Sequence, residues 1–397
     1  MKKKIFIGTA IVLLGLITAG AAGALGLYLW AAHDLPSFKE ITDYNPPLVT
    51  TVYARDGDVL GHFYRERRFL VQLEDMPDYL VKAFLAAEDS GFYDHPGIDV
   101  TAIFRAMVKN IRAGDIKQGG STITQQIIKR LLLTPEKSYE RKLKEAILAY
   151  RLESYLSKDD IITIYLNHIY LGARSYGVEA AARSYFGKHV SELTLAEAAV
   201  LAGLPQAPSR YDPYRHPERA KGRQKYVLGQ MLEAGWISQE QYEEALNAPL
   251  EYTAMPDPSW EVGAHYLEEV RRWLIEYLSR DNMEAMGLSL DRYGEDAVYE
   301  SGLHVYTAID LDHQRAAEDA LRDGLEASTK RRGWRGPIQK LAPGQIAEFL
   351  AGQEDVVQDL ASGGWVQAVV DKVSATGAEV LFGNFQGWIP VKSMAWC

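Results

Sequence analysis

The sequence predicts a mainly α-helical protein that begins with one transmembrane helix and ends in a small α+β or all-β region. Three patterns lead to this fold class. An uncharged, mostly apolar run occupies residues 5–32. Apolar residues then recur at helical spacing from about residue 76 to residue 250, as in helices with one buried face. Beyond residue 303 strand-like alternation appears on both sides of one further helix.

The first run predicts an uncleaved signal anchor over residues 1–34. It is longer than the roughly 20 apolar residues that span a bilayer. Lysines at positions 2–4 predict a cytoplasmic N-terminus in the cell's inner membrane, with the remaining chain outside. The alternative is a cleaved signal peptide, which the small residues at 21–24 would permit. Its apolar part is normally only about 7–15 residues.

The composition excludes some classes of protein. Hydrophobic residues make up 47% of the 397 positions, as in a globular protein. The formal charge of −10 argues against a nucleic-acid partner, since such proteins are usually basic. Cys397 is the only cysteine, which excludes an internal disulfide and a cysteine-rich zinc site.

The individual elements follow from local patterns. Short strands at 48–53 and 59–64 flank a turn of Arg55-Asp56-Gly57-Asp58 and predict a hairpin. A helix should end near Glu88. Further helices are expected at 100–111, 121–133, 139–156, 158–169, 177–186, 194–204 and, as a pair, 219–250. After these come a helix at 260–278, a strand at 303–307, a helix at 311–326 and strands at 365–373 and 378–390.

Two clusters in the helical part combine groups suited to chemistry. The acid pair Glu88-Asp89 ends a helix and is followed by aromatic residues and His95-Pro96-Gly97, a tight loop of the kind that positions functional side chains. Gly119-Gly120-Ser121 begins the next helix, where free N–H groups and hydroxyls can receive a phosphate. Taken alone, the first also fits solvated acids at a helix end, and the second fits an ordinary helix cap.

Two further clusters carry charge and aromatic side chains. The segment from Lys137 to Glu145 places Arg141, Lys142 and Lys144 at four, three and one positions before Glu145, which also fits a solvated charged face. Asn167 lies between Tyr165 and Tyr170 in a segment of aromatic and small residues that also fits core packing.

In their order and spacing, these clusters resemble the family 51 peptidoglycan glycosyltransferases, the glycan-polymerising half of class A, 1A-type penicillin-binding proteins. The resemblance covers about residues 49–237, from Glu88-Asp89 through Gly120-Ser121 to Arg141-Lys142 and Tyr165-Leu166-Asn167. It implies a lysozyme-like helical domain at 48–245. It also implies that the chain joins lipid II into β-1,4 glycan strands with inversion and release of undecaprenyl diphosphate.

The resemblance also implies roles for particular residues. Glu88 corresponds to the general base, and Glu145 to a second catalytic glutamate that either orders the nearby cations or holds a divalent ion such as Mg²⁺ or Mn²⁺. Lys137 stands where the family often has arginine, which keeps the charge but loses bidentate geometry. The candidates for substrate binding are His95, Gly120, Ser121, Thr124, Gln125, Gln126, Lys129, Lys137, Arg141, Lys144 and Asn167.

The C-terminal part predicts an incomplete second module. Residues 301–310 resemble the start of the transpeptidase module of class A proteins, so 246–310 are interpreted as a linker and the start of that module. The β pattern at 365–390 resembles an insertion found in some of its members, so 311–397 are interpreted as a partial module with a small OB-like β insertion. No serine has lysine three positions later, so the nucleophile motif of penicillin-binding transpeptidases is missing. We therefore expect no transpeptidase activity from this chain.

Two other functions fit parts of the pattern. Paired carboxylates in a lysozyme-like fold also suit a peptidoglycan-cleaving glycoside hydrolase, although hydrolysis of a neutral bond does not require the dense cationic cluster. A non-enzymatic membrane-tethered scaffold is the other alternative. The expected partners are lipid II, the growing glycan strand, the cytoplasmic membrane and cell-wall synthesis proteins.

Overall fold

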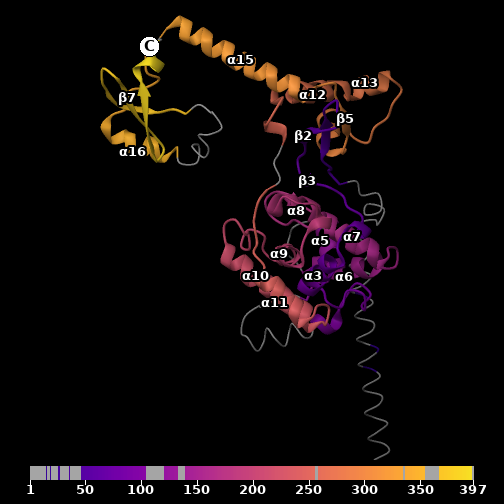
Figure 1. Cartoon of the computed structure of the whole chain (residues 1–397). Coiled ribbons are helices and arrows are strands. Elements are labelled where there is room, and N and C mark those ends of the chain that lie inside the picture. The colour runs from indigo at the N-terminus through magenta and orange to yellow at the C-terminus, as the bar shows by residue number, and fades with distance from the viewer. Residues whose placement is uncertain are drawn as a thin grey trace, which may run out of the picture. The chain divides into compact units, whose positions relative to one another are not determined.

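The computed structural model describes residues 46–103, 120–132, 139–254, 258–333, 336–353 and 366–395, together with positions 15, 18, 26 and 35 (Figure 1). The predicted signal anchor, most of the helix predicted at 100–111, and Lys137 lie outside these ranges. Within them, no helix combines the length and apolar character needed to cross a membrane. The chain divides into two compact units, residues 1–309 and 310–397.

The first unit is built around α3 (Asp78–Glu88), whose apolar face is fully buried. This helix packs against α9 (Leu195–Gly203) and α10 (Pro217–Glu233). Alanines at 196, 198, 199 and 202 are all buried in α9, and such small side chains allow close approach of neighbouring helices. Because α3 is held on two sides, its last residue, Glu88, has a fixed position.

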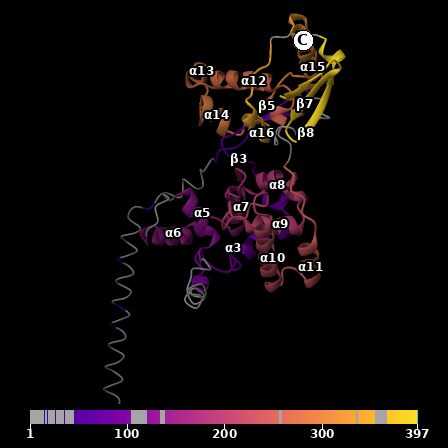
Figure 2. The same cartoon turned by 90° about the vertical axis from the view of Figure 1, so that its left-hand side faces the viewer.

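The remaining helices of this domain surround that centre (Figure 2). They are α5 (Ile123–Leu131), α6 (Tyr139–Leu152), α7 (Lys158–His168), α8 (Val178–Phe186) and α11 (Gln239–Asn247), with 3₁₀ turns η1 (Leu73–Asp75) and η2 (Val190–Glu192). Capping boxes begin α5, α7, α9 and α11, which satisfies N–H groups that the first helical turn leaves without partners.

Two small sheets join segments that are distant in the sequence. The hairpin of β1 (Thr50–Tyr53) and β2 (Val59–Phe63) forms as predicted, and β5 (His304–Tyr306) adds to β1 in parallel. A second, two-stranded parallel pair consists of β3 (Arg67–Arg68) and β4 (Ser175–Tyr176). Beside the first sheet lie η3 (Pro258–Trp260), α12 (Ala264–Tyr277) and α14 (Gly294–Glu300), and α13 (Arg280–Ala285) packs against α12.

The second unit contains α15 (Leu311–Arg332), α16 (Pro343–Ala351) and the turn η5 (Val391–Met394). Its antiparallel sheet has the order β6 (Val369–Val373), β7 (Gly377–Phe382), β8 (Phe385–Pro390). The single strand predicted at 378–390 is therefore wrong. Gly383, at a φ of +51°, reverses the chain there and makes a hairpin. The broader prediction, a mainly helical protein with a small C-terminal sheet, is confirmed.

Candidate active site

Glu88 is the last residue of α3, and its half-buried carboxylate faces α5. The helix stops because Asp89 adopts an extended φ of −161°. Gln126 on α5 donates a hydrogen bond from Nε2 to Glu88 Oε2 at 2.9 Å. Burial raises the pKa of Glu88, while the Gln126 hydrogen bond and the charges of Arg223 and Arg130 oppose the rise. A carboxyl group with a raised pKa is a stronger base than an exposed glutamate.

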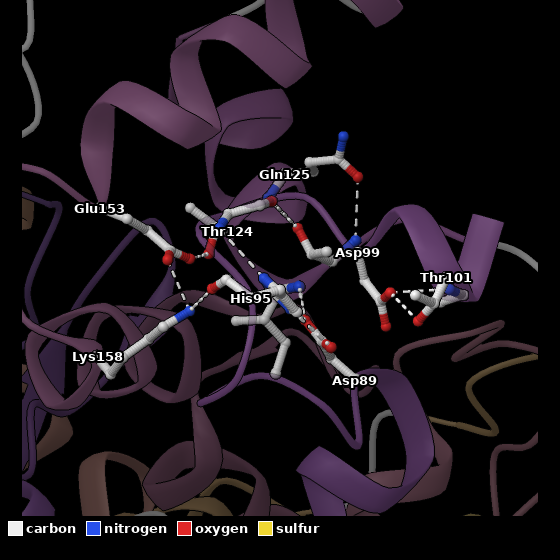
Figure 3. Close-up of polar contacts among 12 residues, drawn as sticks. Asp89, His95, Asp99, Thr101, Thr124, Gln125, Glu153 and Lys158 are labelled. Atoms are coloured by element: carbon white, nitrogen blue, oxygen red, sulfur yellow. Dashed lines mark hydrogen bonds and ion pairs between the residues drawn. The ribbon is translucent and has the colours of Figure 1, made fainter.

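The neighbouring acid, Asp89, joins the end of α3 to the start of α5 (Figure 3). Its carboxylate accepts a hydrogen bond from the Ile123 N–H at 2.9 Å and lies 3.1 Å from His95 Nε2. The Gly97 N–H donates to His95 Nδ1 at 3.1 Å, so Nε2 carries the proton that is donated to Asp89. His95 is thus fully used in holding this junction together.

Thr124 belongs to a separate chain of contacts (Figure 3). Its hydroxyl donates to Glu153 Oε1 at 2.6 Å, and Glu153 pairs with Lys158 at 2.6 Å. Lys158 in turn donates to the His95 carbonyl at 2.7 Å. These contacts tie α5, α6 and α7 to the loop after α3, which makes them a support for the site.

Glu145 lies on α6, and its almost completely buried side chain pairs with two cations. Arg141 Nε is 3.2 Å from one carboxylate oxygen, and Lys142 Nζ is 2.8 Å from the other. Lys142 also donates to Ser121 Oγ at 2.8 Å. One ammonium group therefore links α6 to the residue just before the α5 cap.

Glu88, Gln126 and Glu145 open onto one cavity of about 370 Å³. The residues that line it are Glu88, Ser121, Gln125, Gln126, Lys129, Arg130, Arg141, Lys142, Glu145, Pro205 and Gln206. Four of them are cations and two are carboxylates. The cavity therefore presents a basic carboxylate beside an excess of positive charge, which suits proton removal next to a departing anion.

The structure brings together most of the predicted site residues. Those that line the cavity are Glu88, Ser121, Gln125, Gln126, Lys129, Arg141 and Glu145. The others are absent from its lining: His95, Gly120, Thr124, Lys144 and Asn167. Gly120 instead lies against the Ile103 backbone, and a Cβ added at Gly120 would be 3.1 Å from the Cα of Ile103. Lys137 is outside the described residues.

Lys144 and Asn167 have structural partners. Lys144 pairs with Glu140 at 2.9 Å. Asn167 binds both backbone groups of Val71, each at 2.9 Å, and donates to the Thr163 carbonyl at 3.0 Å. The amide of Asn167 thereby fastens the segment before η1 to α7.

The predicted set omitted Lys142, Arg130, Pro205 and Gln206, all of which line the cavity. Helical spacing could have found Lys142, because residues three or four apart share a helix face whereas adjacent residues do not. By that rule Lys142 faces Glu145 and Lys144 does not. No periodic signal marks Pro205 or Gln206, which follow α9 in a loop.

The described residues contain no cluster of three or more histidine, cysteine or acidic side chains arranged to hold a metal ion. Both oxygens of Glu145, the predicted candidate ligand, face cations instead.

Comparisons with known proteins agree with this geometry. Residues 56–232 match the Transglycosylase family, and residues 334–397 match the penicillin-binding protein OB-like domain. Penicillin-binding protein 1A of Aquifex aeolicus is 44% identical over 328 residues, which are 83% of this chain and 42% of the relative. The Neisseria lactamica protein of that name is 43% identical over 340 residues, or 84% of this chain and 41% of the relative.

A crystal structure of penicillin-binding protein 1A from Haemophilus influenzae is also similar, with 28% identity and a TM-score of 0.45, over 88% of this chain and 40% of that one. The chain spans about two fifths of the length of the curated relatives it matches. Together, the cavity around Glu88 and these sequence matches identify a peptidoglycan transglycosylase domain of the penicillin-binding protein 1A family, followed in this chain by the family's OB-like domain.

Proposed function

We propose that this chain polymerises lipid II into β-1,4-linked glycan strands, with Glu88 as the general base. Glu88 removes the proton from the 4-hydroxyl of the acceptor sugar, and that oxygen bonds to the anomeric carbon of the donor. The bond between this carbon and the diphosphate oxygen breaks, and the electron pair leaves with the lipid diphosphate. One direct displacement inverts the anomeric carbon. Positioned proton transfer of this kind typically contributes about 10²–10⁴-fold to a rate.

The observation that carries the proposal is the pairing of Glu88 with a cationic wall in one cavity. The leaving diphosphate gains negative charge as the bond breaks, and fixed cations stabilise that charge more in the transition state than in the bound substrate. Hydrolysis of a neutral glycosidic bond has no such leaving group, so the charge of the cavity favours transfer from a diphosphate.

For Glu145 we propose an ordering role. Its two carboxylate oxygens are already engaged by Arg141 and Lys142, so it fixes the cations that would face the diphosphate. In this role the glutamate neutralises part of the cationic wall and prevents its side chains from repelling one another. We further propose that residues 1–34 anchor the chain in the cytoplasmic membrane, where its lipid-linked substrate would be found.

Polymerisation of lipid II by the detergent-solubilised chain, read as glycan ladders on a gel, tests the proposal. The wild type and Glu74→Gln, which alters an exposed glutamate on η1, should form ladders. Glu88→Gln should form none while keeping a wild-type circular-dichroism spectrum. Ladders from Glu88→Gln would remove the assigned base, and no ladders from folded wild type would favour a scaffold role.

A further inference from the structure

A second cavity, of about 300 Å³, adjoins the first along α5. Arg130 lines both cavities and marks the boundary between them. Beyond this boundary, the lining comes from α5, from the end of α7 and from the parallel pair β3–β4. Arg68 belongs to β3, Glu66 directly precedes it, and Tyr176 belongs to β4. None of the predicted catalytic or substrate-binding residues lies in this lining, although Tyr165 and Tyr170 belong to the aromatic cluster noted in the sequence.

The walls of the second cavity combine aromatic rings with a fixed ion pair. Tyr170 and Tyr176 place their ring centroids 5.0 Å apart. The buried Arg68 guanidinium lies 5.1 Å from the Tyr176 centroid and donates to the Pro47 carbonyl at 3.0 Å. It also pairs with Glu66 at 2.9 Å. Aromatic surface with a few rigidly held polar groups is the usual composition of a pocket for a small organic ligand.

The charge of this cavity differs from that of the first. Glu66 neutralises Arg68, and burial, together with the charge of Arg68, lowers the pKa of His168 to about 4, so this histidine is uncharged at neutral pH. Arg130 at the boundary is then the one cation in the lining without a carboxylate in the same lining to balance it. An uncharged ligand rich in hydroxyl groups fits these walls better than a diphosphate.

The second cavity is also close to the reacting centre. The Tyr165 hydroxyl, in its wall, donates to Gln126 Oε1 at 3.4 Å, and Gln126 donates to Glu88. A ligand that contacts the Tyr165 hydroxyl is therefore linked to the base through two side chains, Tyr165 and Gln126. Because Arg130 lines both cavities, a saccharide that extends past it from the second cavity enters the cavity that contains Glu88.

We propose that the second cavity is a saccharide subsite, which holds a sugar ring of the glycan adjacent to the ring that reacts. Its Tyr170 and Tyr176 rings cover the apolar face of that sugar, and Glu66 and Arg130 bind its hydroxyl groups. The subsite rests on the proposed polymerase function but takes a ligand with neither lipid nor phosphate, so it can be tested separately.

The probe is the uncharged tetrasaccharide of β-1,4-linked N-acetylglucosamine, which has the glycan backbone without lactyl groups, lipid or diphosphate, titrated into the detergent-solubilised full chain by calorimetry. Tyr170→Leu keeps an apolar side chain but removes the ring, and should raise the dissociation constant more than tenfold. The control Tyr155→Leu changes an exposed tyrosine absent from the lining of either cavity and should bind as wild type.

Equal binding by wild type and Tyr170→Leu would overturn the subsite, as would no binding by folded wild type. In polymerisation assays, Tyr170→Leu should raise the KM for lipid II several-fold with kcat nearly unchanged. Ladders combined with unaltered tetrasaccharide binding by Tyr170→Leu would reject the subsite alone. Tetrasaccharide binding that depends on Tyr170, without any ladders from wild type, would instead reject the polymerase proposal and retain the saccharide site.

Discussion

Gln126 donates a 2.9 Å hydrogen bond to Glu88, and this contact opposes the effect of burial on the same carboxyl group. The amide favours the ionised form of Glu88, which is the form a general base requires, while burial favours the protonated form. The usable pH range of the site therefore depends on the balance between these two effects.

Removal of the Gln126 amide should move the acidic limb of the activity profile to higher pH. Gln126→Leu removes a contact that lowers the pKa of Glu88, so the base becomes protonated at a higher pH than in the wild type. The profile of kcat/KM against pH measures this shift. Gln239→Leu removes a comparable amide–carboxylate bond, to Glu243 on exposed α11, and should leave the limb in place. An acidic limb that moved to lower pH, or that moved equally in both variants, would contradict the view that Gln126 lowers the pKa of Glu88 as the general base.

Glu88→Gln should make the protein more stable at neutral pH. Because the pKa of Glu88 is raised in the folded state, its ionisation destabilises folding. This cost is absent at a pH below the pKa of Glu88 in the unfolded chain, and it is fully present at a pH above the pKa of Glu88 in the folded protein. Thermal unfolding should therefore show a higher Tm for the variant at pH 8 and little difference at pH 4. Glu74→Gln is the control. A lower Tm for Glu88→Gln than for the wild type at pH 8 would contradict a raised pKa of Glu88 in the folded protein.

Two lysines on α6 give a matched test of the cationic wall. Lys142 lines the cavity and contacts both Ser121 and Glu145, whereas Lys144 pairs with Glu140 and is absent from the lining. Lys142→Met should lower kcat/KM for lipid II about 10–100-fold, a loss of about 1.4–2.7 kcal/mol of transition-state stabilisation. Lys144→Met should change it less than about threefold. Equal losses would mean that only the overall charge of the helix matters.

Asn167 should contribute to stability and little to catalysis. Asn167→Ala removes a buried side chain and leaves both backbone groups of the half-buried Val71 without their partner, which should cost about 2–4 kcal/mol. Denaturant unfolding measures this loss. Asn247→Ala removes one exposed bond to the Glu243 carbonyl and should change stability by less than about 0.5 kcal/mol. A folded Asn167→Ala protein that cannot polymerise at low temperature would assign this residue to the substrate instead.

The sequence located the helices well because their limits are set locally. Thr122 and Gln125 cap each other at the start of α5, so the predicted helix at 121–133 and the observed Ile123–Leu131 differ only at their ends. The direction of each side chain was harder to predict. Thr124 and Gln125 are adjacent, yet one supports Glu153 and the other lines the cavity.

Contacts between distant segments could not be predicted from local patterns. The β3–β4 pair is two residues long on each side, which is too short to produce a recognisable alternation. The second cavity depends on this pair, because Arg68 and Tyr176 come from its two strands. Its residues therefore appear in the sequence as an ordinary charged run and an ordinary aromatic segment.

The parallel pairing of β1 with β5 determines how the transglycosylase domain responds to tension. Tyr53 and His304 are 251 positions apart, yet they lie side by side. Because β1 and β5 are parallel, the chain enters β1 at one end of their shared edge and leaves β5 at the other end. A force that pulls the chain before β1 and the chain after β5 apart therefore loads this edge, here called the seam, in shear. The Thr51–Leu303 and Tyr53–Thr307 backbone bonds would then resist together instead of opening one after another. Force passing along the chain would cross this seam and leave the helices around Glu88 unloaded.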